Sequence, residues 1–191
     1  VDEDYESHVE YRWPEENIIA SVKRLALTEE AEEGDVVEYD VACSSRCCSY
    51  IVKEGAMVRR ADELRQRLRM RGFRCSVVYT NSARRLNVIP LFASRLQGLR
   101  YLSIKWGVDL GKVAVFIGEG GDTDYEELMV GVHKTVVVKG IVECDSESLM
   151  RSEDSFRRED TLPLPNPNLG YLEKDCEVRE LLSVLEGLAV K

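Results

Sequence analysis

Three carboxylates that could bind a cation follow an apolar stretch in the second half of the chain. Residues 113–117 are apolar without interruption, and Gly118 then begins a glycine-rich turn. The acids Glu119, Asp122 and Asp124 lie in and just after that turn. Ligands bind beyond the carboxyl ends of strands in open α/β sheets, so this spacing favours a cation or phosphate site. Acids in a first turn and an Asp or Thr N-cap would equally suit a helix start, and the stretch alone leaves both interpretations open.

Composition limits the classes of partner. The chain has 191 residues, of which 44% are hydrophobic and 32% charged, and this is enough apolar content for a packed core. The formal net charge of -9 opposes binding to nucleic acid or to an anionic membrane, because the summed field repels polyanions. We therefore expect a soluble protein that binds neither.

The cysteines and histidines predict no zinc site. Six cysteines contain no CxxC pair, and the two histidines, His8 and His133, have no spacing suited to zinc. The sequence shows no signal peptide and no apolar run near the roughly 20 residues of a membrane span, so we expect a cytoplasmic protein. The chain begins in charged sequence without Met, and we expect further sequence upstream.

Periodicity in the first half predicts an α+β arrangement. Alternation predicts a strand over residues 8–13, and Pro14 then begins a helix with one apolar face through Ala26. Residues 28–38 are acidic and predict a solvated loop, and residues 48–52 predict a strand.

An arginine-rich helix is expected next. Leu64 and Leu68 lie on its apolar face, together with Val58 and Ala61, and its outer face carries six arginines. The arginines could bind phosphate or nucleic acid, or they could form a solvated face. The solvated interpretation is favoured, because the acidic loop upstream can compensate the charge and no aromatic platform accompanies it.

The second half predicts a hairpin followed by parallel strands. The hairpin joins residues 75–80 to 86–90. Ser94 caps a helix to Trp106, on which Leu96, Leu99, Leu102 and Trp106 are expected to point inward. Further elements are expected as follows: a buried parallel strand at 113–117, a helix at 124–130, a strand at 135–138, an irregular region at 141–170 and an amphipathic helix at 178–188. Two parallel strands cannot bury both faces of a sheet, so the missing strands are expected upstream.

Several ordered blocks carry a family resemblance. They are residues 7–13 (SHVEYRW), 64–75 (LRQRLRMRGFRC), 87–95 (NVIPLFASR), 99–102 with 106–107, 118–126 (GEGGDTDYE) and 131–135 (GVHKT). Together they resemble the carboxyl-terminal domain of plant sucrose-phosphate synthases over about residues 5–140, and the region from 151 to 171 is similar more loosely.

The resemblance implies a fold. That domain is similar to sucrose-6-phosphate phosphatase, a member of the haloacid dehalogenase superfamily. The expected fold class is α/β, with a partial haloacid-dehalogenase-like Rossmannoid core and an α+β cap. Residues 1–92 would be the cap region, 93–140 the carboxyl-terminal half of the core, and 141–191 an irregular tail ending in an amphipathic helix. The first half of the core would lie upstream.

The resemblance also implies an altered phosphatase site. Such phosphatases use an Asp nucleophile in a DxDxT motif, a phosphate-binding Lys and a GDxxND motif for magnesium. The nucleophile would lie upstream, and the DxD of Asp2 to Asp4 follows no apolar strand and is treated as coincidental. Arg95 stands at the lysine position as a candidate phosphate ligand. Glu119, Asp122 and Asp124 stand at the metal motif as candidate magnesium ligands, with Glu119 and Thr123 departing from the motif.

The expected function is that of a piece of a larger enzyme. The parent would be a sucrose-phosphate synthase, transferring glucose from UDP-glucose to fructose 6-phosphate, with its glycosyltransferase domain upstream. This segment would contain no catalytic residue and would serve regulation, stability or association with sucrose-6-phosphate phosphatase, with sugar phosphate as a possible ligand. The alternatives are a magnesium-dependent sucrose-6-phosphate phosphatase whose first core half lies outside these residues, and a non-catalytic interaction module.

Overall fold

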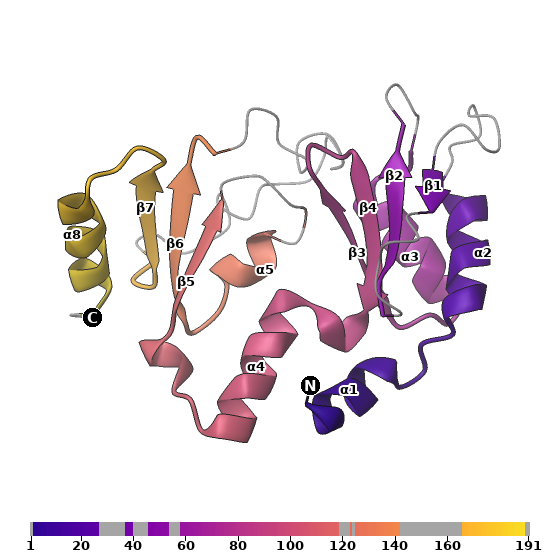
Figure 1. The fold of residues 1–191 in the computed structure, drawn as a ribbon, viewed down its shortest axis with the longest axis horizontal. Coiled ribbons are helices and arrows are strands. Elements are labelled where there is room, and N and C mark those ends of the chain that lie inside the picture. Colours follow the sequence, from indigo (N-terminus) through magenta and orange to yellow (C-terminus); the bar gives the residue numbers. More distant parts are fainter. Residues whose placement is uncertain are drawn as a thin grey trace.

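Two β-sheets lie side by side along the long axis of the molecule (Figure 1). The computed structural model describes residues 2–26, 37–39, 46–53, 58–118, 123, 125–141 and 166–189. One sheet has four strands and the other has three. Each sheet is built from sequence-local elements, so the chain forms two packed units joined by short connections.

The four-stranded sheet is antiparallel, with the order β1-β2-β4-β3. Its strands are β1 (Val37–Tyr39), β2 (Cys48–Val52), β3 (Cys75–Thr80) and β4 (Arg85–Pro90). The predicted hairpin is confirmed, because β3 pairs with β4 across a turn with positive φ at residues 81–83. The predicted strand at 48–52 is confirmed as well. The solvated-loop prediction is wrong at residues 37 and 38, which belong to β1, and residues 28–36 lie outside the described residues.

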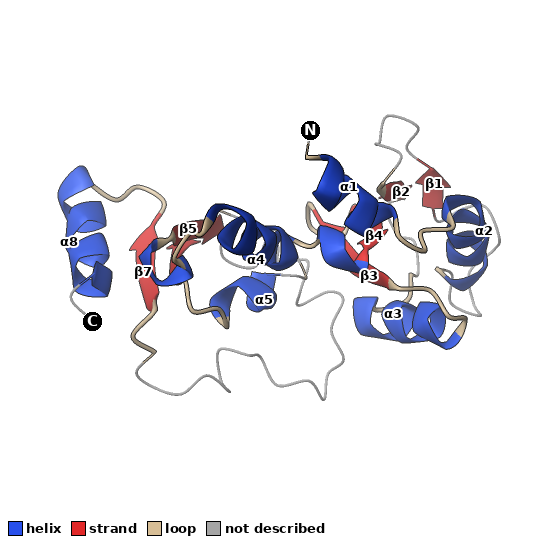
Figure 2. Cartoon of the chain, turned by 90° about the horizontal axis from the view of Figure 1, so that it is seen from below, coloured by secondary structure: helices blue, strands red, loops and turns tan. Residues whose placement is uncertain are grey.

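Helices α2 (Glu15–Leu25) and α3 (Ala61–Met70) pack against this sheet (Figure 2). The apolar faces predicted for both helices supply the core, since Ile18, Val22, Leu64 and Leu68 are fully or almost fully buried. Trp13 packs against the same core from the connection that precedes α2. The helix after Pro14 and the arginine-rich helix are therefore confirmed.

The predicted strand at residues 8–13 is wrong. Residues Glu3–Glu10 form helix α1, whose N-cap Asp2 accepts a hydrogen bond from the backbone N–H of Tyr5 at 3.2 Å. Acids in the first turn add favourable interactions with the helix dipole. The alternation was short, and the cap with its acidic first turn outweighs it. Only Val9 of α1 is buried, and the helix ends before Arg12, which has a positive φ.

Arginines in α3 and just before it pair with acids of the helix. Arg59 and Arg67 both contact Glu63, and Arg65 contacts Asp62. These partners are three or four residues apart, the spacing that places side chains together on a helix surface. Acids within α3 thus compensate part of this charge. Compensation by the acidic loop stays a prediction, because that loop lies largely outside the described residues.

The three-stranded sheet is parallel, with the order β5-β6-β7. The strands are β5 (Ala114–Gly118), β6 (Lys134–Lys139) and β7 (Leu169–Glu173). The parallel strands predicted near 113–117 and 135–138 are confirmed. The prediction of an irregular region is wrong at residues 169–173, because these form the third strand, paired with β6. The sheet thus gains a third strand from downstream, and the strands expected upstream stay a prediction. The sequence of β7 has little β-branched character, and pairing with β6 decides its conformation.

Helices cover the two faces of the parallel sheet unequally. On one face, α4 (Arg95–Trp106) and α5 (Tyr125–Met129) pack against Ile117 and Val137. On the other, α8 (Val178–Ala189) packs against Val136 and Leu172. The adjacent residues 136 and 137 point to opposite faces, as strand geometry requires. The amphipathic terminal helix is thus confirmed and docks on the sheet.

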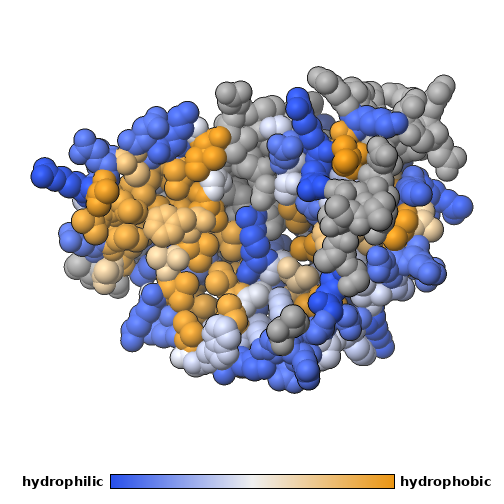
Figure 3. Space-filling model, in the orientation of Figure 1, coloured by the Kyte–Doolittle hydropathy of each residue, from blue (hydrophilic) through white to orange (hydrophobic). Residues whose placement is uncertain are grey.

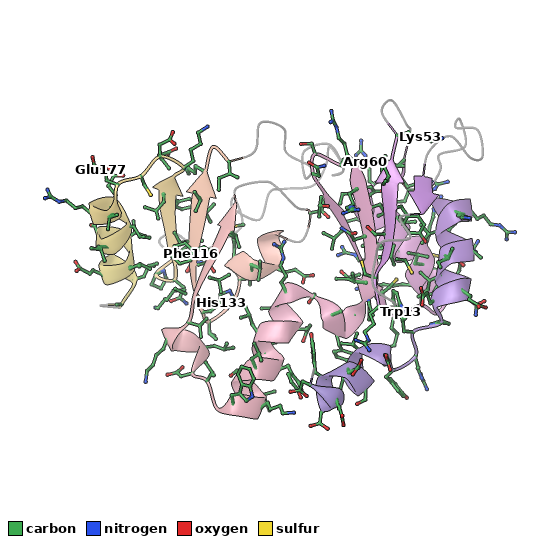
Figure 4. All side chains as sticks on the ribbon, in the orientation of Figure 1. Trp13, Lys53, Arg60, Phe116, His133 and Glu177 are labelled. Atoms are coloured by element: carbon green, nitrogen blue, oxygen red, sulfur yellow. The ribbon has the colours of Figure 1, made fainter. Side chains whose placement is uncertain are left out.

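Two burial predictions in this half are wrong. Trp106 was expected to point inward but is 67% exposed, at the last turn of α4 before Gly107 ends the helix with a φ of 62°. The strand at 113–117 was expected to be buried, yet Phe116 is 50% exposed. Phe116 lies on β5, an edge strand, and α8 covers β6 and β7 instead (Figure 4). Position in the sheet, rather than residue type, sets its exposure.

Helix hydrophobicity and the cysteine thiols were examined for membrane spans and for disulfides. No helix in the described ranges is long and apolar enough to cross a membrane. Within the same ranges Cys47, Cys48, Cys75 and Cys176 carry free thiols.

Candidate functional site

The candidate ligand loop begins at the carboxyl end of β5. Gly118, the last residue of β5, pairs in register with Val138 of β6. Both strands run in the same direction, so their carboxyl ends meet at one edge of the sheet. The loop leads through Thr123 into α5, which packs back on the sheet through Leu128 and Met129. This is the place in an open α/β sheet where ligands bind.

The predicted site residues are only partly located. Glu119, Asp122 and Asp124 lie outside the described residues, so their geometry stays a prediction. Arg95 is described and lies on the exposed first turn of α4, directly after the N-cap Ser94. Ser94 accepts a hydrogen bond from the N–H of Gln97 at 3.3 Å, as the sequence predicts. That Arg95 lies close to the three acids therefore also stays a prediction. The described residues themselves contain no group of three His, Cys, Asp or Glu side chains that could hold a metal ion.

Thr123 connects the ligand loop to the other sheet. Its hydroxyl accepts a hydrogen bond from the backbone N–H of Tyr79 at 2.9 Å, and its own N–H donates to the Tyr79 carbonyl at 3.1 Å. Tyr79 belongs to β3, the edge strand of the four-stranded sheet. Sequence reasoning considered Thr123 as a helix cap and as a departure from a metal motif. Nothing local in the sequence indicates a partner 44 residues away.

The Tyr79 side chain is fixed as well. It is fully buried, and its hydroxyl donates to the carbonyl of Arg59 at 2.9 Å. Burial raises the pKa of Tyr79, which keeps the hydroxyl protonated as a donor at neutral pH. The backbone that receives Thr123 is therefore held by a packed and hydrogen-bonded side chain.

His133 holds the far end of α5. Its Nε2 lies 2.7 Å from the carbonyl oxygen of Leu128, and the Thr135 hydroxyl donates to the same oxygen at 2.9 Å. A carbonyl can only accept, so Nε2 carries a proton and donates in this arrangement. Nδ1 is buried without a hydrogen-bond partner. The ring also fills the space over Gly131, where an added Cβ would lie 1.9 Å from the His133 ring. His133 thus ties α5 to the start of β6 (Figure 4).

A polar cluster joins α1 to α4. Lys105 Nζ donates to Asp2 at 2.8 Å and to Asp4 at 2.9 Å, and the Tyr101 hydroxyl donates to Asp2 at 2.9 Å. The hydrogen bond from Lys105 lowers the pKa of Asp2 to about 2, and the bond to Asp2 raises the pKa of Lys105. Asp2 is thus a helix cap and an ion-pair partner, which agrees with the view that its likeness to a DxD nucleophile motif is coincidental.

The sequence is similar to a known protein family and to known plant proteins. The family model for sucrose-6F-phosphate phosphohydrolase matches residues 1–161. The chain is 55% identical over 191 residues to sucrose-phosphate synthase 4 of Arabidopsis thaliana, covering 100% of this chain and 18% of that protein. It is 41% identical over 189 residues to the sucrose-phosphate synthase of Zea mays, covering 98% of this chain and 18% of the relative. The chain therefore spans less than a fifth of these relatives.

A solved structure supports the fold class. The sucrose-phosphatase of Synechocystis sp. PCC6803, in complex with sucrose and phosphate, superposes with a TM-score of 0.68 and 12% sequence identity. The match covers 98% of this chain and 67% of that one. At this identity the similarity shows the fold alone, and it confirms the expected α/β class with a Rossmann-like parallel sheet. With the family match and the synthase relatives, the chain belongs to the sucrose-6F-phosphate phosphohydrolase family and is a sucrose-phosphatase-like domain of the kind that sucrose-phosphate synthases carry.

Proposed function

We propose that this chain is the carboxyl-terminal, phosphatase-like domain of a plant sucrose-phosphate synthase. The parent protein transfers glucose from UDP-glucose to fructose 6-phosphate in sucrose synthesis, and a glycosyltransferase domain precedes this segment. One observation carries the proposal: the whole chain aligns with sucrose-phosphate synthases while spanning less than a fifth of their length. On this proposal the four-stranded sheet with its helices is the cap and the three-stranded sheet belongs to the core.

The domain serves regulation, stability or association and has no hydrolytic role of its own. Within the 191 residues no DxDxT motif follows an apolar strand, so they supply no nucleophile for phosphoryl transfer. Arg95 replaces a lysine, and a planar guanidinium does not place charge as an ammonium does. Glu119 replaces the first metal-binding Asp, which moves its carboxylate by about one methylene, and a misplacement of about 1 Å can cost roughly 100-fold in rate.

Residual ligand binding is part of the proposal. Glu119, Asp122 and Asp124 offer carboxylate oxygens, the donors that Mg²⁺ prefers, and Arg95 is the candidate ligand for the phosphate of a sugar phosphate. When bound, magnesium would neutralise phosphate charge. Separate sucrose-6-phosphate phosphatase is the proposed protein partner, and the cytoplasm is the proposed location.

An uncovered apolar face supports the view that more of the core lies elsewhere in a longer protein. Figure 3 shows apolar side chains gathered over the three-stranded sheet. Phe116 of β5 and Leu182 of α8 are about half exposed, and Ile141 is 54% exposed. A groove of about 560 Å³ lies between Ala114 and the end of α8. Monomeric proteins rarely leave such faces open, and a third of the matched phosphatase structure has no counterpart here.

A direct assay tests the absence of hydrolysis. The full-length parent protein and the 191-residue chain are each incubated with sucrose 6-phosphate and Mg²⁺, and released phosphate is measured. We expect no release above the blank, while the full-length protein still forms sucrose 6-phosphate from UDP-glucose and fructose 6-phosphate. Hydrolysis by either protein at an ordinary enzymatic rate, about 1 per second or faster, would overturn the proposal.

The second candidate is a magnesium-dependent sucrose-6-phosphate phosphatase. The family description and the similarity to a solved sucrose-phosphatase favour it. The sequence that precedes Val1 separates the two candidates. An intact DxDxT motif after an apolar strand would support the phosphatase, and a degraded motif after a long glycosyltransferase region would support the synthase.

A further inference from the structure

The carboxyl-terminal end of α3 carries positive charge that the nearby acids do not neutralise. Residues 59–74 contain seven arginines and two acids, which gives this segment a net charge of +5 in a chain of -9, so the remaining residues total -14. Both acids, Asp62 and Glu63, pair with arginines nearer the start of the helix. In this segment, the exposed arginines without an ion pair to any residue that the structure describes are Arg69, Arg71 and Arg74.

Backbone hydrogen bonds, and not the arginines, satisfy carbonyl groups at the end of this helix. Gly72 adopts a φ of 88°, and its N–H donates to the carbonyl of Arg69 at 2.9 Å. The N–H of Phe73 donates to the carbonyl of Leu68 at 3.2 Å, and the Phe73 ring packs against the core. These two bonds form a Schellman motif, which fixes the backbone that carries the arginines before any partner binds. The helix dipole favours cations in the last turn, but Arg74 lies beyond that turn.

Met70 forms an apolar centre among these arginines. Its side chain is 80% exposed in the last turn of α3. Successive residues of an α-helix are about 100° apart, so Arg69 and Arg71 lie on either side of Met70, and Arg74 follows after the turn. We call these four residues the α3 basic patch. Protein interfaces combine an apolar centre with a polar rim and are enriched in methionine and arginine.

The charge and size of the α3 basic patch indicate the class of partner. Every cation in residues 59–74 is an arginine, and the planar guanidinium binds a carboxylate through two parallel hydrogen bonds. Nucleic acid and anionic membranes are extended polyanions, and they would also meet the remaining residues of the chain, which repel them. Helix α3 has ten residues and is about 15 Å long, a length that about five residues of extended peptide cover. A short acidic peptide segment fits this charge and size.

We propose that the α3 basic patch is a docking surface for an acidic segment of a partner protein. Carboxylates of that segment bind the three guanidinium groups, and an apolar side chain between them packs on Met70. The patch lies on the opposite side of the four-stranded sheet from α1 (Figure 2). Cys47 and Ile89 line the cavity beside α1, while their neighbours Cys48 and Val88 pack in the core that α3 covers. The inference is independent of the proposed function, because no candidate ligand takes part in it.

A binding measurement on the full-length parent protein tests the surface. The probe is a fluorescent peptide of about ten residues, glutamates around one central leucine, which is longer than the patch. The patch variant combines Arg69→Gln, Arg71→Gln and Arg74→Gln. By fluorescence anisotropy we expect the peptide to bind the wild type, and to bind the patch variant at least roughly tenfold more weakly.

A control variant removes the same charge from other exposed positions. It combines Arg84→Gln, Arg100→Gln and Arg179→Gln, which lie in the β3–β4 turn, on α4 and on α8. It should bind the peptide as the wild type does. Because all six arginines are exposed, both variants should keep the wild-type melting temperature. No binding of the peptide to the wild type, or equal weakening in the two variants, would overturn the proposal.

A double-mutant cycle tests the contact with Met70. It combines Met70→Ser with replacement of the leucine in the peptide by serine. We expect each change alone to weaken binding about three- to tenfold, and the two together to weaken it by less than the product of the single effects. Effects that multiply fully would show that the leucine does not contact Met70, and the proposed docking would then be wrong.

Other polyanions and a second copy of the chain are compared with the peptide. Single-stranded oligo-dT and phosphatidylserine vesicles should bind the wild type more weakly than the peptide does. Tighter binding of either one, lost in the patch variant, would assign the surface to nucleic acid or to a membrane. Self-association of the wild type that disappears only in the patch variant would assign it to a second copy. Each of these results would overturn the proposal.

Discussion

Asp2 has two roles at the level of single residues. It accepts the hydrogen bond that caps α1, and it receives hydrogen bonds from Lys105 and Tyr101 of α4. These bonds stabilise the charged carboxylate, which explains a pKa of about 2 against an ordinary value of 3.8. A residue near the start of the sequence thereby attaches α1 to an element about 100 positions later.

The pH dependence follows from the lowered pKa of Asp2. A carboxyl group whose pKa is depressed by folding stabilises the folded form fully above its ordinary pKa. That contribution disappears as the pH falls from about 4 towards 2. In Lys105→Met we expect the pKa of Asp2 to rise towards 3.8, as measured by the carboxyl carbon shift in an NMR titration. The attachment of α1 should then lose most of its dependence on pH in that range.

Lys112→Met is the control for this titration. Lys112 contacts Asp109 at 3.7 Å. Its substitution by Met removes a cation of the same type from the same half of the chain. It should leave the titration of Asp2 unchanged. An Asp2 titration that is the same in Lys105→Met and the wild type would show that Lys105 is not the cause of the low pKa.

The connection between α5 and β6 shows how one element is held by its neighbours. Helix α5 has only five residues and is too short to be stable by itself. His133 and Thr135 both bind the carbonyl of Leu128 near its end, and the His133 ring fills the space beside Gly131. The helix therefore depends on a tertiary contact that needs a glycine at position 131.

Gly131→Ala should destabilise the chain by about 1–3 kcal/mol, because the new methyl group would overlap the buried ring. Gly187→Ala is the matched substitution within α8, where an added Cβ meets nothing within 4 Å. It should be neutral or stabilise by up to about 1 kcal/mol, since alanine favours a helix. Urea unfolding of the two variants measures both effects. Equal free energies of unfolding for Gly131→Ala and the wild type would contradict the proposed packing of His133.

For the whole molecule, the open face of the parallel sheet is the main feature. Among the residues that the structure describes, β5 has a free edge and Phe116 is half exposed, so this part of the core has no cover there. An uncovered edge strand and an apolar patch both favour association between molecules. We therefore expect the 191-residue chain by itself to be marginally stable and prone to self-association.

Phe116→Asp should reduce this self-association, as measured by light scattering over a range of concentrations. Met70→Asp is the control, because Met70 is 80% exposed but lies on α3 of the other unit. It should leave the association unchanged. A wild-type chain that stays monomeric and unfolds cooperatively and reversibly on heating would contradict the expectation of an incomplete core.

Local sequence patterns were enough to predict most of the helices and strands. The cap at Ser94, the apolar faces of α2 and α3, the hairpin of β3 and β4 and the apolar run of β5 each lie within a few neighbouring residues. The sequence blocks that resemble sucrose-phosphate synthases predicted the fold class. The three candidate acids came from their spacing after the apolar run, the resemblance added Arg95, and of these four residues the structure locates Arg95.

Features that depend on partners far apart in the chain became visible only in the folded molecule. Strand β7 exists because it pairs with β6, and Phe116 is exposed because β5 has a neighbouring strand on only one side within the described ranges. The alternation at residues 8–13 was too short to compete with the cap and the contacts of α1. Thr123 has a bonding partner because β3 is an edge strand. Pairing, edge position and burial arise from residues far apart in the chain, and a local pattern cannot contain them.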